Sequence, residues 1–327
     1  MNTKSIDLLN IGLIAIALTI SFFFPFELFL FSYAVLGPLH YLTEITWLHK
    51  RNYFTTGKND FVWLCILSGL VSLFALLFTE YQLWAILFTY LAFVIALSAV
   101  IFKSWWKKIL AAVAGFFIGY SIHHFPAFFF VFAIFLPTII HVFLFTALFM
   151  TAGALKSKSV AGGVAVLLFV SGGIMCFVFK PEFSWYSIND YTMKSFIKSG
   201  FDELGRAIIY ILNLGKTDRE TLFGTATGVG VVRFIAFAYT YHYLNWFSKT
   251  SVIKWHEVPR VWLISVVMVW ILSVGLYAYD YRVGLIALYF LSILHVFLEF
   301  PLNFRSMADI ATHIRRAVPN IRRQGIS

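Results

Sequence analysis

Six histidine and glutamate side chains lie inside long apolar stretches of the sequence, where ionisable residues are otherwise rare. They are His40, Glu44, His141, His242, His295 and Glu299. Neutral imidazole is a common ligand for iron, zinc and copper. A carboxylate can bind the same metal or hold the second ring nitrogen of a histidine. We therefore interpret the six residues as candidate ligands of a transition metal, with iron(II) as the expected ion.

Two histidine–glutamate pairs have the same spacing. The segments His40-Tyr-Leu-Thr-Glu44 and His295-Val-Phe-Leu-Glu299 both read His-x-x-x-Glu. Residues four apart share one face of a helix, so each pair can point at a single centre. A lone histidine in an apolar helix is more often a hydrogen-bonded packing residue. Four imidazoles from four helices, with one or two carboxylates, would instead form a metal site inside a helical bundle.

The composition indicates that these residues are carried by membrane helices. The chain has 327 residues, of which 61% are hydrophobic and only 12% are charged. Soluble domains carry about 25% charged residues. Several apolar runs reach the roughly 20 residues that a helix needs to cross the hydrocarbon core. The sequence thus predicts an all-α, polytopic transmembrane bundle of about ten spans, at 9–23, 26–48, 61–79, 82–102, 109–122, 126–152, 160–179, 223–246, 260–279 and 283–303.

The positions of Lys and Arg predict the orientation of the bundle. With the N-terminus inside, 17 of these residues lie in inner segments and seven in outer segments, six of the seven in one long loop. This distribution follows the positive-inside rule and predicts that both termini are cytoplasmic. Residues 1–304 would be a single integral membrane domain, with 180–222 as an extracytoplasmic loop that contains a surface helix near 197–213. Residues 305–327 would be a basic cytoplasmic tail.

Under this topology the six candidate ligands share one depth. The spans 26–48, 126–152, 223–246 and 283–303 all run from outside to inside, and the six residues fall in their cytoplasmic halves. Random placement would scatter the residues in depth. An ionisable side chain at membrane depth costs a few kcal/mol by insertion scales, so it usually has a function. This shared depth is the main functional signal in the sequence.

Three other ionisable residues are expected to have simpler roles. Arg233 lies within the span 223–246, and we expect it to pair with a carboxylate across the bundle or to extend toward the interface. His123 and His124 precede Pro126 at the outer end of the span 109–122. We interpret them as interfacial residues, with a metal or proton role on the outer side as the alternative.

The segment Phe31-Ser-Tyr-Ala-Val-Leu-Gly-Pro-Leu-His40-Tyr-Leu-Thr-Glu44 resembles the first histidine motif of the Brp/Blh-like β-carotene 15,15′-dioxygenases. In that family a Gly-Pro-His-type turn opens a membrane helix and an acid follows the histidine. In this chain Leu39 separates Pro38 from His40, and the acid is Glu44 rather than an Asp at the family spacing. The likeness covers about 20 residues and the overall topology.

Members of this family are polytopic, and we expect this chain to be a multi-pass protein of the bacterial inner or cell membrane. Family members are thought to use His-ligated iron(II) and dioxygen to cleave carotenoids to retinal. His40 matches the family motif, whereas His141, His242 and His295 would be the remaining ligands by role only.

Three functions remain open from the sequence. The favoured hypothesis is a metal-dependent oxygenase that acts on a lipid-soluble substrate such as a carotenoid, with membrane lipids and dioxygen as its other partners and no nucleic acid. The second is a proton- or ion-coupled transporter that uses Glu44, Glu299 and Arg233. The third is a structural membrane protein whose histidines only pack. A desaturase or hydroxylase is less favoured, because HxxxH and HxxHH boxes are lacking.

Overall fold

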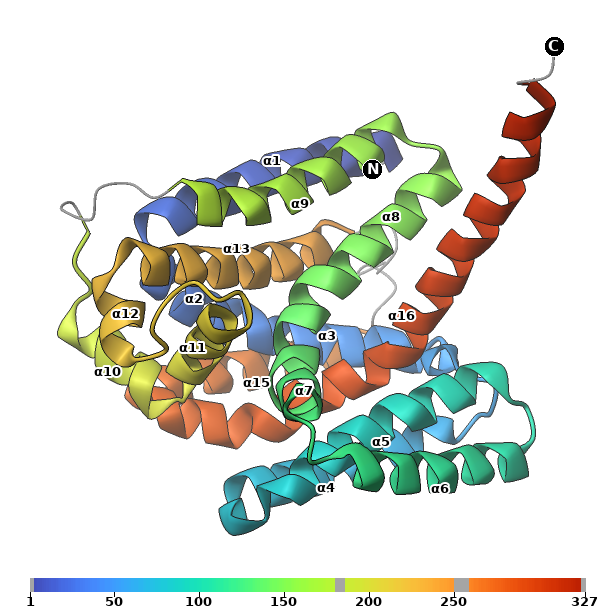
Figure 1. Ribbon diagram of the computed structural model, residues 1–327, viewed down its shortest axis with the longest axis horizontal. Helices are drawn as coiled ribbons and strands as arrows, with labels where there is room; N and C mark the ends of the chain where they lie inside the picture. The colour runs from blue at the N-terminus through green and yellow to red at the C-terminus, as the bar shows by residue number, and fades with distance from the viewer. Residues whose placement is uncertain (1–2, 180–185, 250–258, 325–327) are drawn as a thin grey trace.

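The computed structural model describes residues 3–179, 186–249 and 259–324, and every regular element in these ranges is helical (Figure 1). The elements of the first half are α1 (Thr3–Phe23), α2 (Pro25–Phe31), η1 (Ser32–Leu36), α3 (Gly37–His49), η2 (Asn52–Phe54), α4 (Asp60–Leu76), η3 (Thr79–Tyr81), α5 (Gln82–Ile101), α6 (Trp105–Ile122), α7 (Pro126–Phe129), η4 (Phe130–Phe145) and α8 (Thr146–Ser157). The elements of the second half are α9 (Val160–Val178), α10 (Asp190–Lys198), α11 (Phe201–Ile211), α12 (Arg219–Gly224), α13 (Ala226–Ser248), α15 (Arg260–Tyr279) and α16 (Tyr281–Gln324). The predicted all-α fold class is confirmed.

Seven segments of the described chain are long and apolar enough to cross a membrane, which is the pattern of a multi-pass membrane protein. They are Lys4–Phe23, Pro25–His49, Thr79–Ile101, Pro126–Ser157, Val160–Val178, Arg260–Tyr279 and Tyr281–Arg316. The other three predicted spans form α4, α6 and α13. The number of ten spans and the cytoplasmic location of both termini stay predictions.

Proline-containing turns end two helices where the sequence predicts a break. Phe24 leaves helical backbone geometry at φ −134° and ψ 58°, and Pro25 opens α2. Helix α6 ends at Ile122, and Pro126 opens α7. Proline suits a first helical turn because its missing N–H would have no partner there.

Helix α13 runs through the centre of the bundle. It packs against α1, α2 and α9, and nearly all of its side chains are buried (Figure 1). Gly230 allows the close approach to α9, since a Cβ atom there would lie 2.8 Å from the carbonyl oxygen of Cys176. Because protein rather than lipid surrounds α13, it tolerates the polar residues Arg233 and His242, which lower its hydropathy.

Two π-helical segments adjoin the candidate ligands. Element η1 leads directly into α3, which carries His40, and η4 itself carries His141 together with Pro137. A proline inside an α-helix removes a backbone hydrogen bond and disturbs the preceding turn, and wider π-type turns occur often at functional sites. The backbone is therefore irregular at the points from which two of the histidines project.

The described part of the long predicted loop, residues 186–222, contains α10, α11 and the start of α12 rather than one helix. A turn at Gly200, with φ +73°, separates α10 from α11, and α11 covers most of the predicted surface helix. Helix α11 packs against α13 and buries Asp202, whose carboxylate accepts a 2.7 Å hydrogen bond from Arg219. The ion pair thus holds α11 and α12 of this loop together, and the contacts between α11 and α13 hold the loop against the bundle.

Helix α16 does not end where the predicted membrane domain ends. It continues from Tyr281 to Gln324, so residues 305–324 of the predicted tail extend the same helix. Pro301 lies within it, and the ribbon bends part-way along (Figure 1). An internal proline is a common cause of such bends.

Candidate metal centre

Four histidines from four different helical elements meet inside the bundle. His40 comes from α3, His141 from η4, His242 from α13 and His295 from α16. Their exposed fractions are 1%, 2%, 6% and 4%, and one ring nitrogen of each lies within 4.8 Å of the others. The prediction that these imidazoles share one centre is confirmed.

The spacing of the ring nitrogens suits a single metal ion. The Nε2 atoms of His40 and His242 are 3.1 Å apart, and those of His141 and His295 are 3.2 Å apart. Two nitrogens that each lie about 2.1 Å from one ion would be roughly 3.0 Å apart at a right angle and roughly 3.4 Å apart at a tetrahedral angle. The observed separations fall between these two values.

Two histidines have partners that favour a proton on Nδ1, which leaves the lone pair of Nε2 free to bind a metal. Nδ1 of His141 lies 3.0 Å from Oε2 of Glu299, and Nδ1 of His242 lies 2.8 Å from the Thr146 hydroxyl. A proton on Nδ1 avoids repulsion between lone pairs in the first contact and allows a donated hydrogen bond in the second. Each Nε2 then presents a lone pair to the common centre, as in histidines that bind metals.

The two glutamates occupy different places around the centre. Oε2 of Glu44 lies 3.0 Å from Nε2 of His40, the nitrogen that faces the other imidazoles. Glu299 instead contacts the outward-facing nitrogen of His141, on a different helical element, rather than supporting His295 on its own helix. The first predicted His-x-x-x-Glu pair is therefore in contact, whereas the second glutamate reaches across to a neighbouring element.

The carboxylates provide a test of whether a cation fits. Oε2 of Glu44 and Oε2 of Glu299 are both buried, and among the residues that the structure describes each has a histidine ring nitrogen at 3.0 Å but no hydrogen bond of regular geometry. Burying an uncompensated carboxylate is costly. A divalent cation at the histidine centre would offset that cost, so this donor set fits a metal ion.

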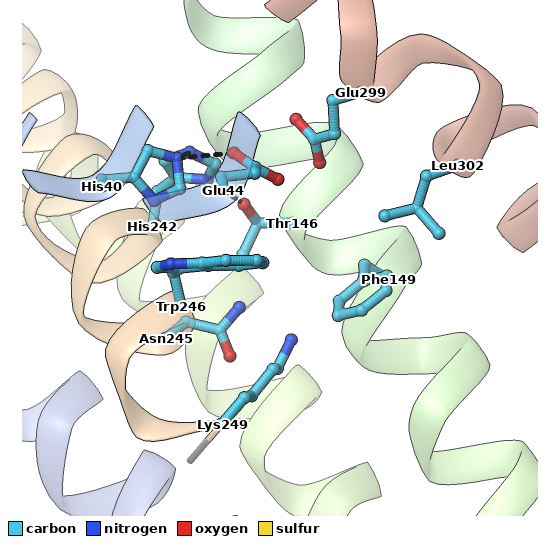
Figure 2. Close-up of a pocket in the computed structure, with 10 residues that line it drawn as sticks. All are labelled: His40, Glu44, Thr146, Phe149, His242, Asn245, Trp246, Lys249, Glu299 and Leu302. Carbon is cyan, nitrogen blue, oxygen red and sulfur yellow. Dashed lines mark hydrogen bonds and ion pairs between the residues drawn. The ribbon is translucent and has the colours of Figure 1, made fainter. Parts of the chain in front are cut away.

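A small void lies beside the histidines on the side of the carboxylates. It measures about 20 Å³ and is lined by His40, His242, Thr146, Glu44 and Glu299, among others (Figure 2). A cavity needs roughly 10–15 Å³ to hold one water molecule, so the void has room for a ligand about as large as water. A small molecule bound there would lie next to the ring nitrogens.

Lys249 extends into the same pocket from just beyond the end of α13. Figure 2 shows its ammonium group between Asn245 and Phe149, on the side of the pocket away from His40. Nζ of Lys249 lies 3.7 Å from the centre of the Phe149 ring, which suits a cation–π contact. Residues Thr146 and Lys249 are parts of the site that sequence reasoning missed, because neither has a distinctive spacing from the histidines.

Aromatic rings surround the histidines. The ring of His40 lies 5.1 Å from Tyr243 and 5.7 Å from Trp246, and the ring of His295 lies 5.5 Å from Tyr41. Each Tyr or Trp ring combines a large apolar surface with one polar atom. They hold the imidazoles in place and keep bulk water from this side of the centre.

The remaining predicted polar residues lie outside this centre. Arg233 is 1% exposed and donates hydrogen bonds to the carbonyl oxygens of Phe22 and Phe179, at the C-terminal ends of α1 and α9. A cation suits the negative end of a helix dipole, so Arg233 joins three helices. His123 and His124 lie at the end of α6, and neither belongs to the four-histidine group.

Comparison with known proteins adds no further assignment. No protein-family model, no curated protein and no solved structure matches the chain.

Proposed function

We propose that the chain is a membrane-embedded oxygenase that binds iron(II) and acts on a lipid-soluble substrate, such as a carotenoid or another polyene or lipid. The observation that supports this most is the convergence of four buried imidazoles from four helices. Neutral histidines together with a carboxylate are typical ligands of non-haem iron. Bound iron(II) would supply the electrons that activate dioxygen.

The contacts suggest a separate role for each carboxylate. Glu44 lies on the metal side of His40 and would be a fifth ligand. Glu299 contacts the outward nitrogen of His141 and would hold that ring in its ligand orientation. The four histidines and Glu44 would hold the ion, and the void of about 20 Å³ offers space for a small molecule beside them.

Metal analysis of the purified protein tests this proposal first. We expect close to one iron per chain, falling at least tenfold in His40→Ala and His295→Ala. His123→Ala is the matched control, since it removes a histidine that lies outside the centre. Wild-type protein that retains no transition metal after anaerobic purification with iron(II) would contradict the proposal.

Activity is then measured with dioxygen and candidate substrates. Iron-loaded protein is incubated with β-carotene or another polyene, and aldehyde products and oxygen consumption are followed. We expect turnover that requires both iron and dioxygen and that is lost in His141→Ala. Iron-loaded protein that consumes no oxygen with any polyene or lipid would support a different use of the metal.

A proton- or ion-coupled transporter is the second candidate. The observation in its favour is that Glu44, Glu299 and Lys249 line one pocket with two of the histidines (Figure 2). Ionisable groups that share a cavity at membrane depth are typical of ion pathways. Proton or ion flux into liposomes by metal-free protein, abolished by Glu299→Gln, would favour this function over the oxygenase.

A further inference from the structure

A large cavity lies between the ends of several helices, next to the metal centre. Its volume is about 710 Å³, and its walls come from α1, α3, α8, α13 and α16, among others. A cavity of this volume falls within the range of roughly 300–1,000 Å³ that is usual for pockets holding one organic ligand.

The cavity and the small void at the histidines share part of their lining. Phe149, Asn245, Lys249 and Leu302 border both spaces. They form a collar, a name used here for these four residues, through which a narrow part of a ligand could approach the histidines. Asn245 and Leu302 are buried, whereas Phe149 and Lys249 are partly exposed.

Charged side chains line the outer rim of the cavity, and most of the wall between the rim and the collar is apolar, while Lys249 and Asn245 lie at the collar. Lys156, Arg305 and Asp309 are exposed at the outer rim, while Trp47 and Leu302 are buried deeper in the wall. Asp7 also borders the cavity, but its carboxylate accepts a 2.5 Å hydrogen bond from the Ser159 hydroxyl. Lys156 and Arg305 are the cations at the rim, and Lys249 lies at the collar.

We propose that this cavity binds a single-chain amphiphile with a carboxylate head. The head lies at the rim against Lys156 and Arg305, and the chain extends toward the collar. An arginine guanidinium can hold a carboxylate through two hydrogen bonds, and a lysine adds a second positive charge. Apolar side chains of the wall between the rim and the collar, such as Trp47 and Met150, provide the environment that a hydrocarbon or polyene chain requires.

This inference rests on the proposed oxygenase function and narrows its substrate. It places the chain end of the amphiphile nearest the metal centre and the carboxylate farthest from it. The reacting bond would then lie near the apolar end of the substrate. The collar limits how wide a part of the amphiphile's hydrocarbon chain can be if it is to reach the histidines.

Equilibrium binding to metal-free protein in a neutral maltoside detergent tests the chemistry of the head. We expect oleate to bind at least tenfold more tightly than oleyl alcohol, which has the same chain without the charge. The double variant Lys156→Gln/Arg305→Gln should lose most of this preference, and Arg305→Lys alone should keep it. Lys103→Gln/Lys107→Gln is the matched control, because it removes two exposed cations that do not line the cavity.

Photolabelling tests the direction of the chain. Two oleate derivatives carry a diazirine, one at the end of the chain and one beside the carboxylate, and the labelled residues are identified by mass spectrometry. We expect the first to label collar residues such as Phe149 or Leu302, and the second to label the rim near Ser157 or Asp309. Labelling in the reverse order, or mainly outside the cavity, would overturn the proposed orientation.

The outcomes separate this inference from the proposed function. Equal binding of oleate and oleyl alcohol, or tight binding of β-carotene alone, would overturn the carboxylate amphiphile while leaving an oxygenase possible. Displacement of bound oleate by a two-chain anionic phospholipid at equal concentration would overturn the single-chain assignment. Because these measurements use metal-free protein, a failed metal analysis would remove the oxygenase without changing their result.

Discussion

Replacing Glu299 tests whether the carboxylate on His141 supports a metal ligand. Oε2 of Glu299 is buried and lies 3.0 Å from Nδ1 of His141, its nearest nitrogen contact among the described residues. Removing a partner that orients a ligand histidine typically lowers metal affinity about 10- to 100-fold. This range corresponds to about 1.4–2.8 kcal/mol of binding free energy.

The size of the expected loss of metal affinity depends on which residue replaces Glu299. Glutamine would keep the size of the side chain and an oxygen that can accept from Nδ1, so we expect Glu299→Gln to lower the affinity by about tenfold. Leucine removes both the charge and the acceptor, so we expect Glu299→Leu to approach a hundredfold loss. His141→Ala removes the ligand itself and should lower the affinity most.

The assay is a competition for metal between the protein and a chromophoric chelator, with cobalt(II) as an air-stable probe ion. Glu80→Gln is the matched control, because Glu80 is an exposed carboxylate outside the pocket. Circular dichroism and size-exclusion chromatography establish that each variant is folded. If both Glu299 variants bind cobalt as the wild type does while His141→Ala does not, the orienting role of Glu299 is wrong.

Three further substitutions probe other contacts. Thr146→Val removes the hydroxyl 2.8 Å from Nδ1 of His242, and we expect about a tenfold loss of cobalt affinity by the same chelator competition. Arg233→Met removes the donor to two helix-end carbonyls, so the free energy of unfolding in mixed micelles should fall by roughly 2–3 kcal/mol, and no loss would contradict this role. Gly228→Ala would place a Cβ atom against the backbone carbonyl oxygens of Thr221 and Leu222. It should therefore lower the free energy of unfolding by about 1–3 kcal/mol, as overpacking does. Gly224→Ala is the matched control and should have little effect, because open space surrounds Gly224.

The helices could be predicted because membrane spans leave a strong one-dimensional signal. A long apolar run must satisfy its own backbone hydrogen bonds inside a bilayer, so it forms a helix whatever its neighbours are. The breaks at Pro25 and Pro126 follow from the missing N–H of proline. The extension of α16 past residue 304 was not predicted, because the fall in hydropathy marks where apolar residues end and not where a helix ends.

The convergence of the histidines was also within reach of sequence reasoning. Four histidines at matching depth on predicted helices of one orientation can meet only if those helices are neighbours, and the structure places them so. Which partner each histidine has was not predictable. Thr146 on α8 contacts His242 on α13, and no spacing along the chain predicts that contact. The π-helical turns of η1 and η4 were missed for a similar reason, since they use the same apolar residues as α-helices.

The two His-x-x-x-Glu motifs show that identical spacing need not give identical chemistry. An i, i+4 pair shares a helix face, yet which nitrogen the carboxylate meets depends on the rotation of that helix and on its neighbours. Glu44 meets the inward nitrogen of His40, whereas Glu299 passes His295 and meets the outward nitrogen of His141. If Glu44 is a metal ligand as proposed, Glu44→Gln should change the visible spectrum of cobalt-loaded protein, whereas Glu299→Gln should change the affinity with little spectral shift. Equal spectral changes in both variants would mean that the two carboxylates are equivalent toward the metal, in disagreement with their positions around the histidines.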